Sequence, residues 1–546
     1  MRRVIDGKWW VISALISLGP LWLVPRDSWD GVIGSYGLAT GDFSGLVPWI
    51  TNANWYLLDW FYRALGQVCL FTGIPPWIVV KSVISVCVVL IAVEASRFGE
   101  SVLRLPQEAA RWIGPLVLVF PAWANLYSSV FIYLIFIWAT LAGHRLLHEP
   151  SERLGRVLSL FLAWVLILAG FQINSNLVLV FALEAARWLL RDKQEQWNWR
   201  RTALLVCASV AVYAMLRIAL SPRGIYAGTY NNLLLPVSRA NIIAVVSAIV
   251  MYCTWLPLFI PPLAAAYWLR QRQELRSGAQ LLSEGRGKSG AACLAALLLV
   301  MAAAFPYIAV GKAPILFFYN PFPFLISNNS PVSFTGSRDF LFLADSWSSR
   351  HMFVAIGPIA LLIAAIAAKL SGVPDARGLK ITRVSLLVAW CTLAACLLYT
   401  HHLKLKRFAL EQSLLNYLAQ TELPPPGKVD FEISPFNRRL YGPYESNYWL
   451  WLVSGKTVWA SAVFHDNEVS RKMTLDQRTG FLKDLPSDPM QHRSHFIMQD
   501  YQPGGLCTVM QVTMLLPQNY LAILGAGHRP GLVPVALVNR NSAACG

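Results

Sequence analysis

The sequence is short of charged residues. Asp, Glu, Lys and Arg together make up 14% of its 546 residues, whereas soluble domains average about 25%. Hydrophobic residues make up 56% of the chain, which contains 22 tryptophans. This composition excludes an ordinary soluble protein and predicts a membrane protein.

The sequence also lacks the short motifs of nucleotide and metal chemistry. No HExxH, GxSxG or GxGxxG occurs in a suitable context, and GRGKS at 285–289 has Leu282 where a phosphate-binding loop needs glycine. The nine cysteines include no CxxC pair and no zinc spacing. The sequence therefore predicts no dedicated metal site and no cofactor, with a divalent cation left open at the acidic loop described below.

What the sequence does contain is a series of apolar runs, each of roughly the 17 to 25 residues that can cross a bilayer core. Eleven runs lie near residues 8–25, 74–94, 112–127, 128–147, 157–172, 174–190, 202–220, 248–269, 291–310, 352–370 and 384–400. A further apolar stretch at 233–252 precedes the eighth run without a charged break. It is predicted to be an interfacial helix or half of a re-entrant pair.

Lys and Arg are distributed unevenly between the loops that join these runs, and such residues are retained on the cytoplasmic side. The poorer set of loops holds Arg26, Arg63, Arg223, Arg239, Lys312, Arg338 and Arg350, and the alternate loops hold many more. The N-terminus is therefore predicted to be cytoplasmic, and residues 26–73 and everything after residue 400 to be periplasmic. The net charge of +17 is then a topology signal, and no nucleic-acid partner is expected. The first run is predicted to be an uncleaved anchor.

The composition changes after residue 400, where no spanning run remains. We expect a transmembrane domain at 1–400, a juxtamembrane helix at 401–423 that ends before PPPG, and a soluble domain at 424–546. Strand-like segments lie at 448–453, 457–464, 506–515 and 532–538. The predicted fold is thus an α-helical polytopic membrane protein with about eleven spans, long outer loops and a C-terminal extracytoplasmic β-rich or α+β domain.

A few charged residues lie close to the ends of the runs. Lys81, Glu94 and Glu184 are explained by snorkelling or by pairing at helix ends. The basic cluster that begins at His401 is predicted to bind lipid headgroups, with contact to a donor phosphate as the alternative.

Carboxylates are concentrated directly after the first run, in RDSWDGVIGSYGLATGDFSG at 26–45. Asp27 and Asp30 are three residues apart and would share a face of a helical turn, and Asp42 follows. A carboxylate at a membrane edge is costly and is usually functional, although these three could also be solvated loop acids. The aromatic, amphipathic stretch at 49–65 is suited to lying on the membrane.

This arrangement resembles the first outer loop of the GT-C superfamily of polytopic glycosyltransferases, whose donors are polyprenyl-phosphate sugars. SSRHMFVAIGPIALLIAA at 348–365 is similar to the Arg-aromatic stretch that many of these enzymes carry at the start of a late span, although Met352 and Phe353 replace the usual Tyr-Leu. The resemblance implies about eleven spans, a first-loop Asp as base and often a C-terminal domain outside.

Sugar transfer from a lipid phosphate requires a base for the acceptor hydroxyl and cationic donors for the leaving phosphate. Asp27 or Asp30 would be the base, and Asp42 would position the acceptor, bind a cation or cap a helix. The candidate phosphate donors are Arg350 and His351, with Arg223, Arg239 or Lys312.

The sequence therefore predicts an inner-membrane glycosyltransferase that transfers a hexose or pentose to a periplasmic glycan, lipid or protein, a pilin among them. A surface-polysaccharide polymerase or ligase is the nearest alternative, because such enzymes concentrate Arg and His in one late outer loop, here 311–351. A transporter or flippase fits less well, since no related halves are visible and the acids are peripheral.

Overall fold

The structure is a computed structural model. It describes residues 7–24, 27, 31–43, 47–151, 155–191, 199–221, 238–277, 286–309, 352–371 and 376–420, together with six strands between residues 429 and 539. All structural statements below concern these residues.

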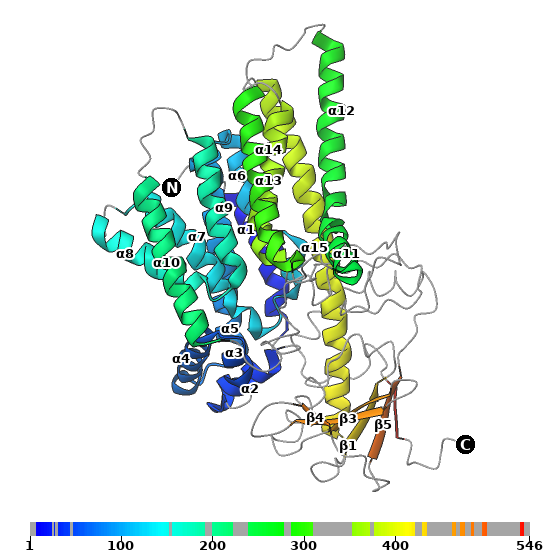
Figure 1. The fold of residues 1–546 in the computed structure, drawn as a ribbon. Coiled ribbons are helices and arrows are strands. Elements are labelled where there is room, and N and C mark those ends of the chain that lie inside the picture. Colours follow the sequence, from blue (N-terminus) through cyan, green and yellow to red (C-terminus); the bar gives the residue numbers. More distant parts are fainter. Residues whose placement is uncertain are drawn as a thin grey trace.

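Helices account for the described chain up to residue 420, and most of them lie alongside one another in a bundle (Figure 1). The α-helices are α1 (Gly7–Trp22), α2 (Gly31–Thr40), α3 (Val47–Asn52), α4 (Tyr56–Thr72), α5 (Pro76–Ser101), α6 (Gln107–Leu118), α7 (Leu134–His148), α8 (Arg156–Gly170), α9 (Asn174–Leu190), α10 (Trp199–Ala219), α11 (Arg239–Tyr252), α12 (Ile260–Ser277), α13 (Arg286–Ile308), α14 (Phe353–Ser371) and α15 (Ala376–Gln420). Three 3₁₀ helices are η1 (Pro121–Asn125), η2 (Ser129–Tyr133) and η4 (Cys253–Phe259).

Five of the described helical segments are long and apolar enough to cross a membrane. They are Pro76–Ser101, Ser129–His148, Gly290–Ile308, Phe353–Ser371 and Gly378–His401, and they coincide with five of the eleven predicted runs. Three shorter apolar helices lie at Arg156–Gly170, Thr202–Leu216 and Trp255–Leu269. The chain is thus a helical protein with candidate membrane spans, whereas the count of eleven stays a prediction.

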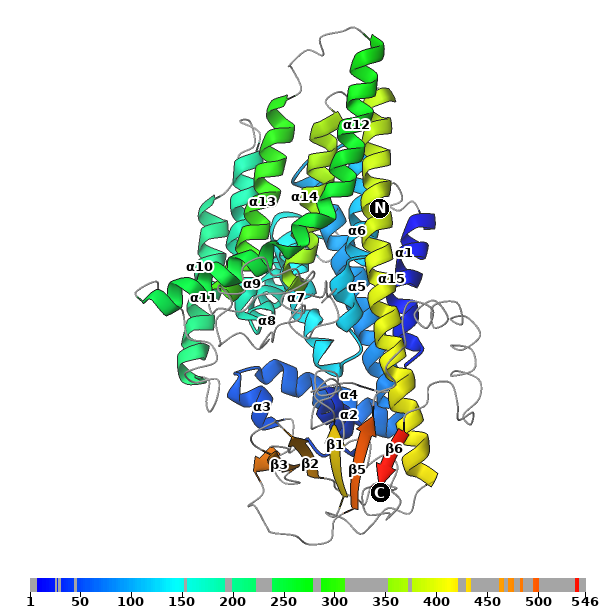
Figure 2. The same ribbon diagram turned by 90° about the vertical axis from the view of Figure 1, so that its right-hand side faces the viewer.

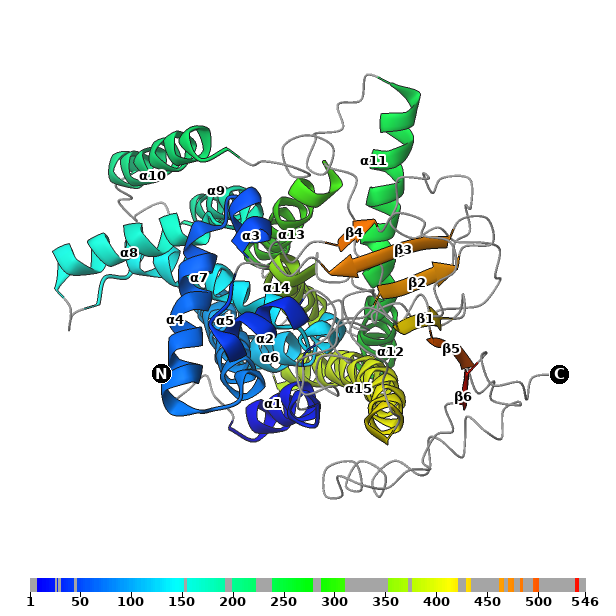
Figure 3. The same ribbon diagram turned by 90° about the horizontal axis from the view of Figure 1, so that it is seen from below.

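Two of the predicted runs are not continuous helices. The run at 112–127 is divided, because α6 ends at Leu118 and Pro121, which has no N–H to continue a helical ladder, opens η1. The run at 248–269 is divided by η4, which contains Pro257. Helix α11 just before it lies across the long axis of the bundle (Figures 2 and 3), which fits the prediction of an interfacial helix at 233–252.

The core of the bundle surrounds α14, whose side chains are almost all buried. This helix packs against α5, α6, α13 and α15. At its N-terminal end, Phe353 lies 5.0 Å from Trp123 and 5.1 Å from Phe131 between ring centroids. These aromatic contacts tie η1 and η2 to the core, and η2 begins at a residue of the candidate site.

Helix α15 is longer than the sequence analysis predicted. The last apolar run and the expected juxtamembrane helix at 401–423 form one unbroken helix up to Gln420, with a length of about 68 Å at 1.5 Å per residue. No proline or glycine interrupts it between residues 379 and 420. The helix therefore runs on from the apolar bundle toward the C-terminal sheet (Figures 1 and 2).

The described C-terminal residues form a six-stranded sheet. Its strands are β1 (Val429–Ile433), β2 (Ser461–His465), β3 (Ser470–Leu475), β4 (Leu482–Asp484), β5 (Ser494–Gln499) and β6 (Ala536–Asn539), in the spatial order β4-β3-β2-β1-β5-β6. Strand β1 pairs in parallel with β2 and β5, and the other pairs are antiparallel.

The observed strands agree only in part with the strand-like segments of the sequence. Strands β2 and β6 overlap the predicted segments at 457–464 and 532–538, whereas those at 448–453 and 506–515 lie outside the described residues. The sheet lies at the same end of the molecule as α2, α3 and α4 (Figures 1 and 2). This placement fits the prediction that the first loop and the C-terminal region share one side of the membrane.

Candidate functional site: the carboxylate of Asp27

Asp27 is the predicted catalytic residue that the structure places in a defined environment. It lies between α1 and α2 in non-helical backbone, and 7% of its surface is exposed. The prediction that Asp27 and Asp30 share a face of a helical turn involves Asp30, which lies outside the described residues, and helix α2 begins at Gly31. The alternative that Asp27 is a solvated loop acid is wrong, because its carboxylate is buried.

Two donors hold the carboxylate of Asp27. The hydroxyl of Ser35 on α2 donates a hydrogen bond of 2.6 Å to Oδ2, and the backbone N–H of Ser129 donates one of 2.8 Å to Oδ1. Ser129 opens η2 and is 102 residues away in sequence. These two hydrogen bonds fix the orientation of the carboxylate relative to α2 and η2.

Tight backbone packing fixes the donors around Asp27. The hydroxyl of Ser129 donates to the carbonyl of Gly31 over 2.8 Å, and the Tyr62 hydroxyl on α4 donates to the carbonyl of Ser129 over 2.7 Å. The buried Oγ of Ser128 makes no hydrogen bond within the described residues. The Ser128 hydroxyl, which can both donate and accept a hydrogen bond, therefore lines the Asp27 site without a partner among the described residues.

Gly31 allows α2 to approach the carboxylate. A Cβ atom at this position would lie 2.1 Å from Oδ1 of Asp27 and 2.3 Å from Oγ of Ser128, separations at which atoms must move apart. We expect Gly31→Ala to lower the free energy of unfolding by about 1–3 kcal/mol, the usual cost of overpacking, and to displace the carboxylate. Thermal unfolding in detergent, together with the transfer assay described below, would measure both effects.

Gly19→Ala is the matched control for that substitution. Gly19 lies on α1 and has nothing within 4 Å of an added Cβ, so the midpoint of unfolding and the activity should be retained. If Gly31→Ala behaves like Gly19→Ala in both measurements, the close packing around Asp27 is contradicted.

A buried lysine secures the end of α1 just before Asp27. Lys81 on α5 is 2% exposed, and its ammonium donates to the carbonyls of Leu21, over 2.7 Å, and of Val24. These carbonyls lie at the C-terminal end of α1, where the helix dipole favours a cation. Of the two predicted explanations for Lys81, snorkelling is therefore wrong, because the side chain is buried, and pairing at a helix end agrees with its bonds to the end of α1.

A second polar chain connects this region to α15. Nε2 of His401 donates to the carbonyl of Ser17 on α1 over 3.0 Å, since a carbonyl can only accept. In the neutral imidazole Nδ1 is then the acceptor, and it receives the Tyr127 hydroxyl over 2.9 Å. His401 is buried, so this member of the predicted headgroup-binding cluster does not face lipid headgroups.

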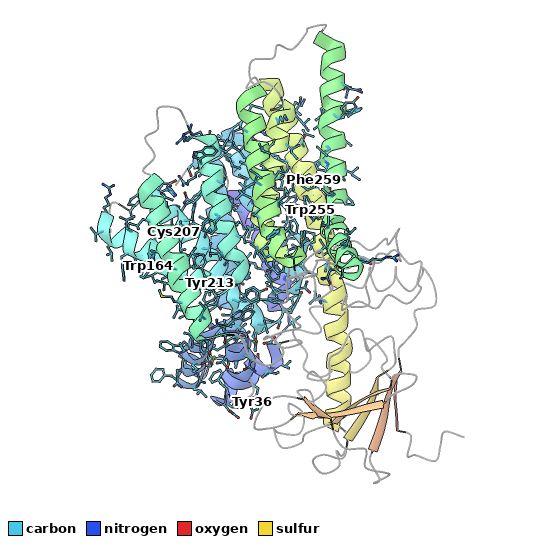
Figure 4. All side chains as sticks on the ribbon, viewed as in Figure 1. Tyr36, Trp164, Cys207, Tyr213, Trp255 and Phe259 are labelled. Atoms are coloured by element: carbon cyan, nitrogen blue, oxygen red, sulfur yellow. The ribbon has the colours of Figure 1, made fainter. Side chains whose placement is uncertain are left out.

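Asp42 lies at the other end of α2. Asp42 is exposed, and its backbone N–H donates to Oγ1 of Thr40. The pKa of Tyr36 on α2 (Figure 4) is raised, mainly because the phenol is partly buried and further because of the negative charge of Asp42. Asp27 is bonded to Ser35 in the middle of α2, whereas Asp42 follows the C-terminal end of that helix by two residues. The roles predicted for Asp42, positioning the acceptor, binding a cation or capping a helix, stay predictions.

The aromatic stretch at 49–65 covers parts of two helices, α3 and α4, and α4 has two distinct faces. Helix α4 buries Leu58 and Tyr62 and exposes Trp60 and Phe71. Exposed aromatic and aliphatic side chains at one end of an apolar bundle are typical of a helix that lies at the membrane surface. The structure thus fits the predicted position of residues 49–65 on the membrane.

Of the candidate phosphate donors, Arg239 lies among the described residues. Arg239 is exposed in the first turn of α11. The alternative base and the remaining candidate phosphate donors, Asp30, Arg223, Lys312, Arg350 and His351, lie outside the described residues.

Sequence reasoning missed three parts of the site and a second polar cluster. Ser129 and Lys81 gave no signal because their partners are 102 and 60 residues away in the chain, and Ser35, eight residues from Asp27, was not singled out as its donor. The second cluster contains His144 and His148 at the end of α7 together with Glu184 on α9. The i, i+4 spacing of the two histidines in HRLLH is a signal that could have identified it.

Comparison with known proteins gives one limited similarity. No protein-family model and no curated protein matches the chain. Two crystal structures of ArnT from Cupriavidus metallidurans, bound to undecaprenyl phosphate and in the apo state, share 12% and 13% sequence identity with it. Each alignment covers 84% of this chain and 92% of the other, with a TM-score of 0.40. This likeness is too weak to assign the chain to a family or a function.

Proposed function

We propose that the chain is an inner-membrane glycosyltransferase that uses Asp27 as its base. The observation that carries the proposal is the buried carboxylate of Asp27, which Ser35 and the backbone of Ser129 hold in one orientation. This carboxylate lies in the acidic stretch that resembles the first outer loop of the GT-C superfamily. An oriented, partly desolvated carboxylate is suited to take the proton of an attacking hydroxyl.

The donor in this proposal is a polyprenyl-phosphate sugar and the acceptor a periplasmic glycan, lipid or protein. The acceptor oxygen attacks the anomeric carbon as its proton passes to Asp27, the bond from that carbon to the phosphate oxygen breaks, and the polyprenyl phosphate leaves with the bonding electrons. The hydroxyl of Ser128, which lies beside Asp27, is placed to bond the acceptor. Cations of the outer loops, Arg223, Arg239, Lys312, Arg350 and His351, would stabilise the leaving phosphate.

The proposed topology places the N-terminus in the cytoplasm and the C-terminal sheet in the periplasm. Lys and Arg are concentrated in the alternate loops of the sequence, and α2, α3, α4 and the sheet lie together at one end of the molecule. In this proposal the C-terminal region binds the acceptor on the same side of the membrane as Asp27. The domains at 1–400 and 424–546 are retained as part of this proposal.

Release of polyprenyl phosphate tests this proposal without knowledge of the acceptor. The purified chain would be incubated in nanodiscs with synthetic polyprenyl-phosphate hexoses, pentoses and aminopentoses and with an envelope extract as the acceptor source. We expect one donor class to release polyprenyl phosphate, with a matching gain of sugar in the extract. Absence of release from every donor class would contradict the proposed function, and translocation of a donor without release would favour a flippase.

A further inference from the structure

The described chain contains a cluster of metal-ligating side chains far from Asp27. His144 and His148 lie one turn apart near the C-terminal end of α7, and Glu184 lies on the neighbouring helix α9. Helix α7 follows directly from η2, and η2 begins at Ser129, which bonds to Asp27. Ten residues of α7 precede His144, and ten helical residues span about 15 Å, which separates the two sites. The cluster takes no part in the site described above.

The three side chains converge on one point. Nε2 of His148 lies 2.6 Å and Nε2 of His144 lies 3.1 Å from Oε1 of Glu184. One potential ligand atom from each residue lies within 4.8 Å of the others. Ligand atoms about 2.0–2.1 Å from a tetrahedral zinc ion are about 3.3 Å apart. A small movement of these side chains would thus admit a cation between them.

Two polar atoms of these side chains are not satisfied by hydrogen bonds within the described residues. Nε2 of His144, whose side chain is 2% exposed, makes no acceptable hydrogen bond within the described residues despite its approach to Glu184. Oε2 of Glu184 is also buried without a hydrogen bond there. A buried polar atom without a partner is costly, and a cation that accepts a lone pair from each would remove both deficits.

The surroundings of the cluster orient the ligands and balance its charge. The ring of His144 packs against Phe98 of α5, with 6.1 Å between centroids, and against His148 at 5.1 Å. Arg187 on α9, the nearby cation, is paired with Glu149 over 3.1 Å. Because the charges of Arg187 and Glu149 balance each other, the net charge at the cluster would come from the Glu184 carboxylate and the bound divalent cation.

We propose that His144, His148 and Glu184 bind a divalent transition-metal ion of the zinc class. Two imidazole nitrogens and one carboxylate oxygen form a donor set that binds zinc in preference to magnesium or calcium. A water molecule would occupy the fourth coordination position. The ion joins α7 to α9, and through Phe98 it supports the packing of α5. The prediction from sequence that the chain has no metal site is replaced by this proposal, which is independent of the proposed function.

The metal content of the full-length chain tests the site. The protein would be purified in detergent with a non-histidine affinity tag, incubated with zinc sulfate, desalted and analysed by inductively coupled plasma mass spectrometry. We expect about one zinc per chain and near-complete loss in His148→Asn and Glu184→Gln. Glu94→Gln is the matched control, because Glu94 is a buried carboxylate paired with Arg97 and Arg145 and should leave the zinc content unchanged.

X-ray absorption at the zinc edge keeps the proposal testable if a variant fails to fold. The unsubstituted protein should show two imidazole nitrogens and one carboxylate oxygen at about 2.0–2.2 Å. A sulfur-rich shell, a zinc content near zero, or full zinc content in a folded variant with His144→Asn and His148→Asn together would overturn the proposal.

Discussion

Replacing Asp27 by Asn is expected to lower the rate of polyprenyl-phosphate release by about 10²- to 10⁴-fold, the range that general bases contribute. Asn has nearly the same shape. Its single carbonyl oxygen can still accept from the backbone N–H of Ser129, and its NH₂ group, which replaces Oδ2, can donate to the Ser35 hydroxyl, which then accepts. Asn has no basic oxygen that can take a proton at neutral pH. The loss should therefore appear in the turnover rate at saturating donor, while the protein stays folded.

Two further substitutions distinguish the role of Asp27 from a general effect of charge removal. Asp59→Asn is the matched control, because Asp59 is equally buried, lies on α4 and pairs with Arg63 over 3.0 Å; it should retain the transfer rate. Asp30→Asn tests the alternative base that the sequence left open. Full activity in both Asp27→Asn and Asp30→Asn would exclude the proposed mechanism.

Replacing Lys81 by Met is expected to cause a large loss of stability. Methionine fills a similar volume but removes the ammonium that bonds the carbonyls of Leu21 and Val24. The carbonyl of Leu21 keeps the backbone N–H of Val24 over 3.3 Å, while that of Val24 loses its buried ammonium donor, at a cost of about 1–3 kcal/mol. The end of α1 is then less well held, and Asp27 follows Val24 by three residues. We expect a fall in the apparent midpoint of thermal unfolding, followed by tryptophan fluorescence, and a lower transfer rate.

Lys8→Met provides the control for the loss of one positive charge. Lys8 lies on α1 and is exposed, so its replacement should leave the midpoint unchanged. The account of Lys81 fails if Lys81→Met and Lys8→Met unfold at the same temperature.

Local patterns in the sequence predicted the helical segments well. The five described spans match predicted runs within several residues, because hydropathy over a single segment is a local property. Interruptions were harder to predict, since Pro121 and Pro257 break helices inside runs that are continuous in hydropathy. The prediction divided α15 into a membrane span and a juxtamembrane helix because the composition changes near residue 400. The helix itself continues without a break to Gln420.

The roles of charged residues could not be predicted from position along a run. Three charged residues lie near the ends of predicted runs but have different partners. Lys81 donates to backbone carbonyls, and Glu94 pairs with two arginines. Glu184 pairs with two histidines. Each outcome depends on a helix that is remote in sequence. The alternative of pairing at helix ends agrees with the contacts of all three residues, whereas snorkelling does not describe the buried Lys81.

By itself, the sequence determined that this is a helical chain with apolar spans and that its acids are concentrated after the first of them. Composition and run length decide these features, because a segment in lipid must hydrogen-bond its backbone N–H and C=O groups internally and must carry apolar side chains. Only the tertiary structure decided that Asp27 is buried and held by Ser35 and Ser129, while Asp42 is exposed. The reason is that burial and hydrogen-bond partners are set by contacts between elements, here across 102 residues.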